Sequence, residues 1–141
     1  MMNEKFLPIK KTKIRNSKFI LGDTISELEK IDSSSIDMAF CDPPYYLQLS
    51  KKLYRPDQSA VSGVDDNWDK FSSYEEYDNF SKKWLHHIKR VLKSDATVWV
   101  IGTYHNIYRI GYLLQNMNFW ILNDLIWRKT NPMPNFKGTR F

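Results

Sequence analysis

Short apolar runs alternate with amphipathic stretches along the chain. The apolar runs predict strands at residues 18–21, 36–41, 96–101 and 119–127. Apolar positions three and four apart predict helices over residues 25–31, 74–91 and 106–117. In the second helix the apolar stripe is expected in the core and consists of Tyr74, Tyr77, Phe80, Trp84, Ile88 and Val91. Strands that are apolar almost throughout, like 36–41 and 96–101, are typical of parallel sheets buried on both faces. The order of elements therefore predicts an α/β fold with a mostly parallel sheet and flanking helices.

Two of the predicted helices begin at recognisable capping residues. Thr24 is the expected N-cap of the first helix. Ser73 and Glu76, three residues apart, form a capping-box pattern at the start of the second helix. Residues 47–71, between the second strand and this helix, show no regular period, and loops of that length in a small domain are usually functional.

Composition and charge narrow the class of protein. A chain of 141 residues with 42 % hydrophobic and 15 % aromatic residues can form one modest core, which excludes a disordered chain. No apolar run approaches the roughly 18 residues that cross a bilayer, and the first residues lack a signal-peptide pattern. With a single cysteine, Cys41, no internal disulfide can form. These features predict a cytoplasmic protein with no membrane partner.

Basic residues gather near the two ends of the chain, and the net charge is +5. We expect residues 1–17 to form a basic N-terminal arm, and the charge weakly favours a polyanionic partner. Asp65, Asp66 and Asp69 lack the ligand spacing of a calcium loop, so they are expected on a solvated loop face. Neighbouring helix histidines point to different faces, so no metal site is expected.

The chemically most informative segment is Asp42-Pro43-Pro44-Tyr45, directly after the predicted strand 36–41. Working residues of open α/β sheets lie beyond the carboxyl ends of strands. A carboxylate and a backbone carbonyl held by two prolines are both acceptors, and the exocyclic amine of adenine or cytosine offers two N–H donors. Accepting both hydrogens would make that nitrogen nucleophilic, while Tyr45 could stack on a flipped base. A plain Asp-Pro turn at a strand end is the alternative.

Four segments resemble the β-class DNA adenine-N6 methyltransferases. They are residues 40–49, 53–71, 100–107 and 127–136. The flanks are similar to the GANTC-recognising subgroup, which includes the cell-cycle-regulated enzyme of alphaproteobacteria and the HinfI modification enzyme. The resemblance runs from about Phe19 to the last residue. It implies a Rossmann-like methyltransferase fold, S-adenosylmethionine as cofactor and double-stranded DNA with a flipped adenine as partner, in a restriction-modification setting.

The resemblance also implies roles for the tetrapeptide. Asp42 and the Pro43 carbonyl would hold the adenine N6, Pro44 would fix the turn, and Tyr45 would stack on the ring. Tyr46 departs from the pattern, because many relatives carry Asn at this place. We expect this difference to change a pocket wall and to leave the reaction unchanged.

Four residues outside the tetrapeptide match family positions. Asp23 corresponds to a residue near the adenine of S-adenosylmethionine. Trp127, Lys129 and Asn131 fall in a family motif near the flipped-base pocket.

The chain lacks the Phe-x-Gly-x-Gly turn that lets the family backbone approach the cofactor. Its closest glycines, Gly102 and Gly111, are nine residues apart. We therefore expect residues 18–141 to be an N-terminal catalytic half, a partial Rossmann-like fold lacking the cofactor-binding strands. Alone it should bind the cofactor weakly and turn over negligibly, and a complementing C-terminal half or a homodimer partner could complete it. The alternatives are a non-catalytic remnant that binds DNA or a partner, and a cytosine-N4 methyltransferase, although those enzymes more often carry Ser at position 42.

Overall fold

The fold consists of a two-stranded parallel sheet and three α-helices in a computed structural model that describes residues 16–47, 58, 66–128 and 130. The elements of this part of the chain are α1 (Thr24–Glu29), β1 (Ile36–Cys41), the 3-10 turn η1 (Asn67–Asp69), α2 (Tyr74–Val91), β2 (Leu92–Val100) and α3 (Ile107–Asn116). Helix α2 connects the two strands, which is the usual crossover for parallel neighbours.

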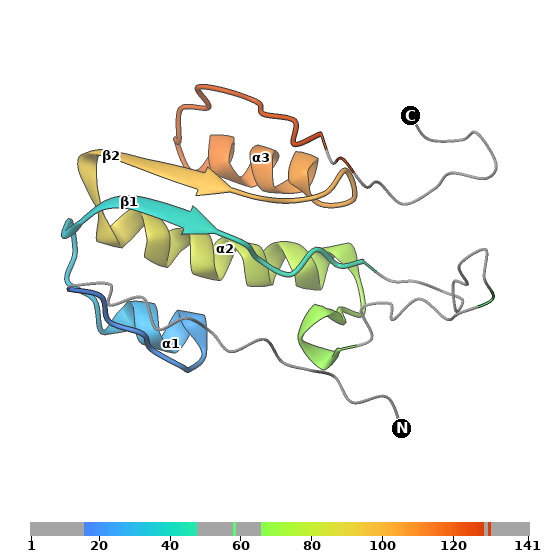
Figure 1. Cartoon of the computed structure of the whole chain (residues 1–141), viewed down its shortest axis with the longest axis horizontal. Coiled ribbons are helices and arrows are strands. Elements are labelled where there is room, and N and C mark those ends of the chain that lie inside the picture. Colours follow the sequence, from blue (N-terminus) through green and yellow to red (C-terminus); the bar gives the residue numbers. More distant parts are fainter. Residues whose placement is uncertain (1–15, 48–57, 59–65, 129, 131–141) are drawn as a thin grey trace.

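The two strands run in the same direction and end at the same edge (Figure 1). Met38 pairs with Thr97 and Cys41 with Val100, while the register shifts between Ile36 and Met38. One residue beyond the pairing, the Ile101 N–H donates to the Cys41 carbonyl at 2.9 Å. The carboxyl ends of β1 and β2 therefore open onto a common edge.

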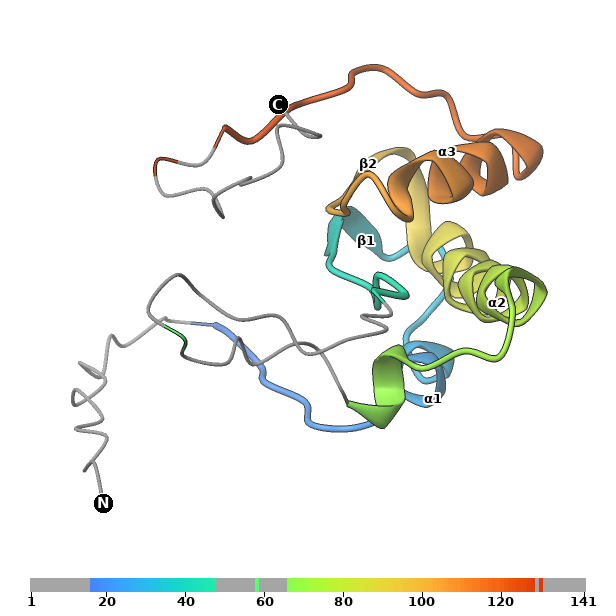
Figure 2. The same ribbon diagram turned by 90° about the vertical axis from the view of Figure 1, so that its right-hand side faces the viewer.

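All three helices lie on one side of the sheet (Figure 2). Ala39, Cys41 and Val98 pack toward the core that the helices form. On the opposite face Phe40 is 65 % exposed and Trp99 is 45 % exposed. The expectation that these strands are buried on both faces is wrong for the described part of the chain, because the side chains alternate and helices cover only one face.

The core forms mainly between α2 and α3. Its buried hydrophobic residues are Tyr77, Trp84, Leu85, Ile88, Leu92, Ile110 and Leu113. The predicted inward stripe of α2 is confirmed at Tyr77, Trp84, Ile88 and Val91, whereas Tyr74 is exposed and Phe80 is half-buried. No helix within the described ranges is long and apolar enough to cross a membrane.

Capping residues were predicted correctly at α2 and wrongly at α1. The Ser73 hydroxyl accepts a hydrogen bond from the Glu76 N–H at 3.2 Å. The Glu76 carboxylate accepts from the N–H of Ser72, whereas a capping box would have it accept from the N–H of Ser73. At α1 the cap is Asp23 and not Thr24. The Asp23 carboxylate accepts from the Ser26 N–H at 2.9 Å, since an extended residue before the helix directs its side chain at the free amides.

Two of the predicted strands do not form. Residues 18–21 and 119–127 are irregular, and all except the half-buried Phe119 are exposed, with Leu21 and Ile126 almost fully accessible. A strand needs a hydrogen-bonded neighbour, and neither segment pairs with β1 or β2. Strand β1 and helix α2 have the predicted bounds, whereas α1, α3 and β2 shift by a few residues: β2 begins at Leu92 and not at residue 96.

Candidate active site

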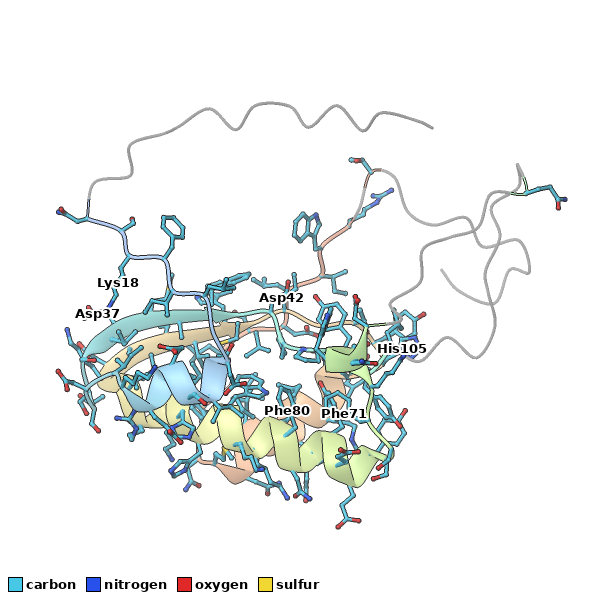
Figure 3. The ribbon with its side chains drawn as sticks, turned by 90° about the horizontal axis from the view of Figure 1, so that it is seen from below. Lys18, Asp37, Asp42, Phe71, Phe80 and His105 are labelled. Atoms are coloured by element: carbon cyan, nitrogen blue, oxygen red, sulfur yellow. The ribbon has the colours of Figure 1, made fainter. Side chains whose placement is uncertain are left out.

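The tetrapeptide begins directly after β1, at the edge where both strands end (Figure 3). Asp42 is exposed there, while Pro43, Pro44 and Tyr45 are half-buried. The prediction that these four residues follow the carboxyl end of a parallel strand is confirmed.

The Tyr45 hydroxyl donates a hydrogen bond to Asp42 Oδ1 at 2.5 Å. Burial raises the pKa of Tyr45 to about 12, with the hydrogen bond to Asp42 and the charge of Asp42 acting in the same direction. Tyr45 therefore stays protonated at neutral pH and orients the carboxylate. A carboxylate has about four lone-pair sites, so one donor leaves acceptor capacity on Asp42.

The backbone carbonyl of Pro44 is held by a tyrosine side chain of α2. The Tyr77 hydroxyl donates to the Pro44 carbonyl at 2.9 Å and accepts from Asn106 Nδ2 at 3.0 Å. Asn106 is 1 % exposed, and its Oδ1 accepts from the Thr103 N–H at 2.8 Å. This chain of hydrogen bonds ties the tetrapeptide to α2 and to the loop after β2. Burial raises the pKa of Tyr77, so its hydroxyl remains a donor.

Asn106 can occupy this place because residue 102 is a glycine. A Cβ on Gly102 would lie 2.9 Å from Asn106 Oδ1 and 3.1 Å from Ile107 Cδ1. Any side chain there would displace the Asn106 amide, which bonds both Thr103 and Tyr77.

A buried carboxylate holds the backbone immediately after the tetrapeptide. Asp69 is 2 % exposed, and its Oδ1 and Oδ2 accept from the Tyr46 N–H at 2.8 Å and the Leu47 N–H at 2.9 Å. The expectation of a solvated face is therefore wrong for Asp69, because two backbone amides replace water around its charge. Asp66 is exposed as expected, and Asp65 lies outside the described residues.

Aromatic rings pack around Tyr46. Three ring centroids lie 5.1–5.8 Å from that of Tyr46: Phe71, Tyr74 and Tyr77. The Arg109 guanidinium lies 4.6 Å above the Tyr74 ring and donates to both carboxylate oxygens of Asp78. This ion pair joins α3 to α2 beside the rings.

A cavity of about 170 Å³ opens at the tetrapeptide. Its lining residues are Asp42, Pro43, Tyr45, Leu47, Trp68 and Asp69. This volume is several times the roughly 30 Å³ of a water molecule in the liquid and below the roughly 300 Å³ of drug-sized sites. A single flat nucleobase suits such a space. A second cavity, of about 490 Å³, is lined by Ile25 and by residues of the segment 71–83, and includes no residue of the tetrapeptide.

Of the other predicted site residues, the two that the structure describes, Asp23 and Trp127, do not line the tetrapeptide cavity. Asp23 is exposed, and the hydrogen bonds from Ser26, chiefly from its N–H, lower the pKa of Asp23. Trp127 is 78 % exposed on an irregular segment, and Lys129 and Asn131 lie outside the described residues. The tetrapeptide cavity by itself is therefore not large enough to hold a methyl donor beside a base, and the cofactor role of Asp23 stays a prediction. Within the part of the chain that the structure describes, no three His, Cys, Asp or Glu side chains gather into a metal site.

Sequence reasoning missed Asp69, Tyr77 and Asn106 as parts of the site. Tyr77 was assigned only to the core, and Asn106 only to a helix start. One signal for Asp69 is its position next to Trp68, an aromatic residue in an otherwise polar stretch just before α2. Nothing in the linear order indicates that the Tyr77 hydroxyl reaches the Pro44 carbonyl, 33 residues earlier.

Residues 36–141 match the model of the DNA methylase family of N6 and N4 methyltransferases, and the chain belongs to this family. Over 120 residues, 85 % of the chain, it is 58 % identical to the type II methyltransferase M.HinfI of Haemophilus influenzae, of which it covers 33 %. It is also 42 % identical over 120 residues to the type II methyltransferase M2.DpnII of Streptococcus pneumoniae, covering 44 % of that protein. The chain thus spans less than half the length of both relatives.

Proposed function

We propose that this chain provides the base-binding and catalytic part of a site-specific DNA methyltransferase that acts on adenine N6. The observation that carries the proposal is the Asp42 carboxylate beside Pro43 and Tyr45 in a cavity of about 170 Å³, which suits one nucleobase. Membership of the DNA methylase family supports the reaction class. The partner is then double-stranded DNA with the target base flipped into this cavity.

The acceptor side of the reaction follows from the turn. The Asp42 carboxylate and the Pro43 carbonyl accept the two N–H groups of the exocyclic amine, which frees the nitrogen lone pair from the ring. The same carboxylate stabilises the positive charge that develops on the amine as its nitrogen attacks. Tyr45 lines the cavity, so its ring can stack on the base while its hydroxyl holds Asp42.

S-adenosylmethionine would supply the methyl group when bound. We propose Asp23 as a contact of its adenine, with the rest of its site coming from a complementing C-terminal segment or a second copy of the chain. Trp127, Lys129 and Asn131 are proposed to line the approach of the flipped base. The choice of adenine rests on Asp at position 42 and on flanks resembling GANTC enzymes, and the two type II relatives support a modification role.

Radiolabelled methyl transfer to GANTC duplexes by the full polypeptide that carries this chain tests the proposal. Digestion to nucleosides should yield N6-methyl-2′-deoxyadenosine, and N4-methyl-2′-deoxycytidine would support the cytosine reaction instead. Asp42→Ala should abolish transfer and leave duplex affinity nearly unchanged, while Asp37→Ala, a carboxylate change near the start of β1, should retain transfer. Full transfer by Asp42→Ala would overturn the role of Asp42.

A chimera separates a wrong assignment from a missing cofactor site. In it, the chain replaces the 120 matched residues of M.HinfI, and the rest of that methyltransferase is retained. Transfer by the chimera and none by the full polypeptide would show that the site is competent and lacks its donor part. No transfer by either protein would leave the DNA-binding remnant as the better reading.

A further inference from the structure

We infer that Asp69 is a positioning residue that holds the Asp42–Tyr45 turn in its base-binding conformation, an inference that rests on the proposed function. Its carboxylate bridges two successive backbone amides just after the turn, those of Tyr46 and Leu47. Asp69 lies 23 residues after Tyr46 and 22 after Leu47, so these hydrogen bonds connect η1 to the segment that follows β1.

The bridge uses both oxygens of a buried charge. Each oxygen accepts one amide, at 2.8 and 2.9 Å, and the side chain is 2 % exposed. Hydrogen bonds to an ionised acceptor are about twice as strong as neutral ones. An amide in place of the carboxylate has only one acceptor atom, so Asp69→Asn would set an NH2 group against one backbone N–H.

The backbone that Asp69 holds is strained. Tyr46 has a φ of 53°, in the left-handed region that non-glycine residues rarely adopt. Asn tolerates this region better than Tyr, so the conformation has a larger backbone cost with Tyr at this position. Tyr46 needs an external constraint to remain there, and the Asp69 carboxylate supplies one at the Tyr46 N–H itself.

The backbone direction at Tyr46 determines how the neighbouring side chains line the cavity. Tyr45 precedes the strained residue and Leu47 follows it, and both line the cavity with Asp42. Asp69 is also in the lining, next to Trp68 of the same η1 turn. If the bridge were lost, Tyr46 could relax toward negative φ, and the Tyr45 ring and its hydrogen bond to Asp42 would move with it.

The test combines amide hydrogen exchange with kinetics, both on the full polypeptide that carries this chain. In Asp69→Asn the amides of Tyr46 and Leu47 should exchange at least about tenfold faster while the amides of α2 keep their protection. Methyl transfer should lose on the order of 10²-fold in kcat with little change in KM for the duplex, as expected when reacting groups are misplaced. Asp66→Asn, an exposed carboxylate at the start of η1, is the matched control and should change neither.

A second substitution distinguishes loss of the Asp69 bridge from a general loosening of the fold. Because Asn accepts a positive φ at less cost than Tyr, the kcat loss from Asp69→Asn should be smaller in a Tyr46→Asn background. A general loosening would instead be aggravated, since Tyr46→Asn removes ring contacts with Phe71, Tyr74 and Tyr77. A larger loss in the double variant would overturn the inference.

The remaining outcomes are decisive in different ways. Faster exchange at Tyr46 and Leu47 with unchanged kcat would overturn the positioning role and leave the proposed function standing. Unchanged exchange of the Tyr46 and Leu47 amides in Asp69→Asn would show that the Asp69 bridge does not hold this backbone, and the inference would be overturned. No methyl transfer by the unsubstituted polypeptide or by the M.HinfI chimera would count against the proposed function, and the positioning role would fall with it.

Discussion

The Tyr77 hydroxyl is the junction between the tetrapeptide and the core, and Tyr77→Phe removes that single atom. The ring is fully buried, so the change leaves almost no cavity. It deletes the donor to the Pro44 carbonyl and the acceptor for Asn106 Nδ2. Asn106 is 1 % exposed, so water has little access to the amide hydrogen that is left without a partner.

The expected cost follows from these contacts. Each lost hydrogen bond is worth about 1 kcal/mol net, and a buried donor left unsatisfied costs about 1–3 kcal/mol. Tyr77→Phe should therefore lower the free energy of unfolding by about 2 kcal/mol. With a urea m-value of roughly 2 kcal/mol/M, the midpoint of unfolding falls by about 1 M.

Urea unfolding followed by circular dichroism measures this shift. Tyr112→Phe is the matched control, since the Tyr112 side chain is exposed on α3 and its change should stay within about 0.5 kcal/mol. Combining Tyr77→Phe with Asn106→Ala should give a coupling energy of about 1 kcal/mol. Equal midpoints for Tyr77→Phe and Tyr112→Phe would refute the hydrogen-bond chain as a source of stability.

Two other predictions concern a glycine and the cysteine. Gly102→Ala should lower the free energy of unfolding, because the added Cβ displaces Asn106. Gly111→Ala is the control: its Cβ would meet no atom closer than 4.0 Å, so helix propensity should raise the free energy of unfolding by about 0.5–1 kcal/mol. Equal effects of the two substitutions in calorimetry would contradict the close approach at Gly102. Burial raises the pKa of Cys41 from 9.0 to about 11, so its thiolate at pH 8 is about 100-fold scarcer than in the unfolded chain. Alkylation by iodoacetamide should accelerate accordingly in urea, and the stability that the neutral thiol contributes below pH 9 should be lost as pH rises toward 11. Equal alkylation rates with and without urea would show that the thiol is not shielded.

Local patterns predicted the elements that carry their own determinants. Helix α2 combines a cap at Ser73 with an apolar stripe, and both are properties of neighbouring residues. Strand β1 was predicted at its observed bounds because a run that is apolar except for Asp37 ends at Cys41, directly before Asp42. The segments 18–21 and 119–127 are equally apolar but do not pair, since a strand depends on a neighbour that its own sequence does not specify.

The candidate site, too, was predictable only where its determinants are neighbours in the sequence. The tetrapeptide was found from its residues and from its place after a strand. Its supports were not, because Tyr77 and Asp69 act through contacts that cross 33 and 23 residues of sequence. Asp69 shows the limit most clearly: in the sequence it is one of three acidic loop residues, and only the fold buries it against two amides.

Helix α2 ends at Val91 and strand β2 begins at Leu92, with no connecting residue between them. Tyr77 lies in the helix and Val100 at the far end of the strand, and the register shift opposite Ile36 and Met38 lies between them, from Leu92 to Thr97. An insertion or deletion between Tyr77 and Val91 would rotate the helix, and one between Thr97 and Val100 would flip the strand, because no loop is present in either segment to absorb it. These two segments therefore act as fixed-length spacers, and changes in chain length have to fall at the register shift or outside the stretch.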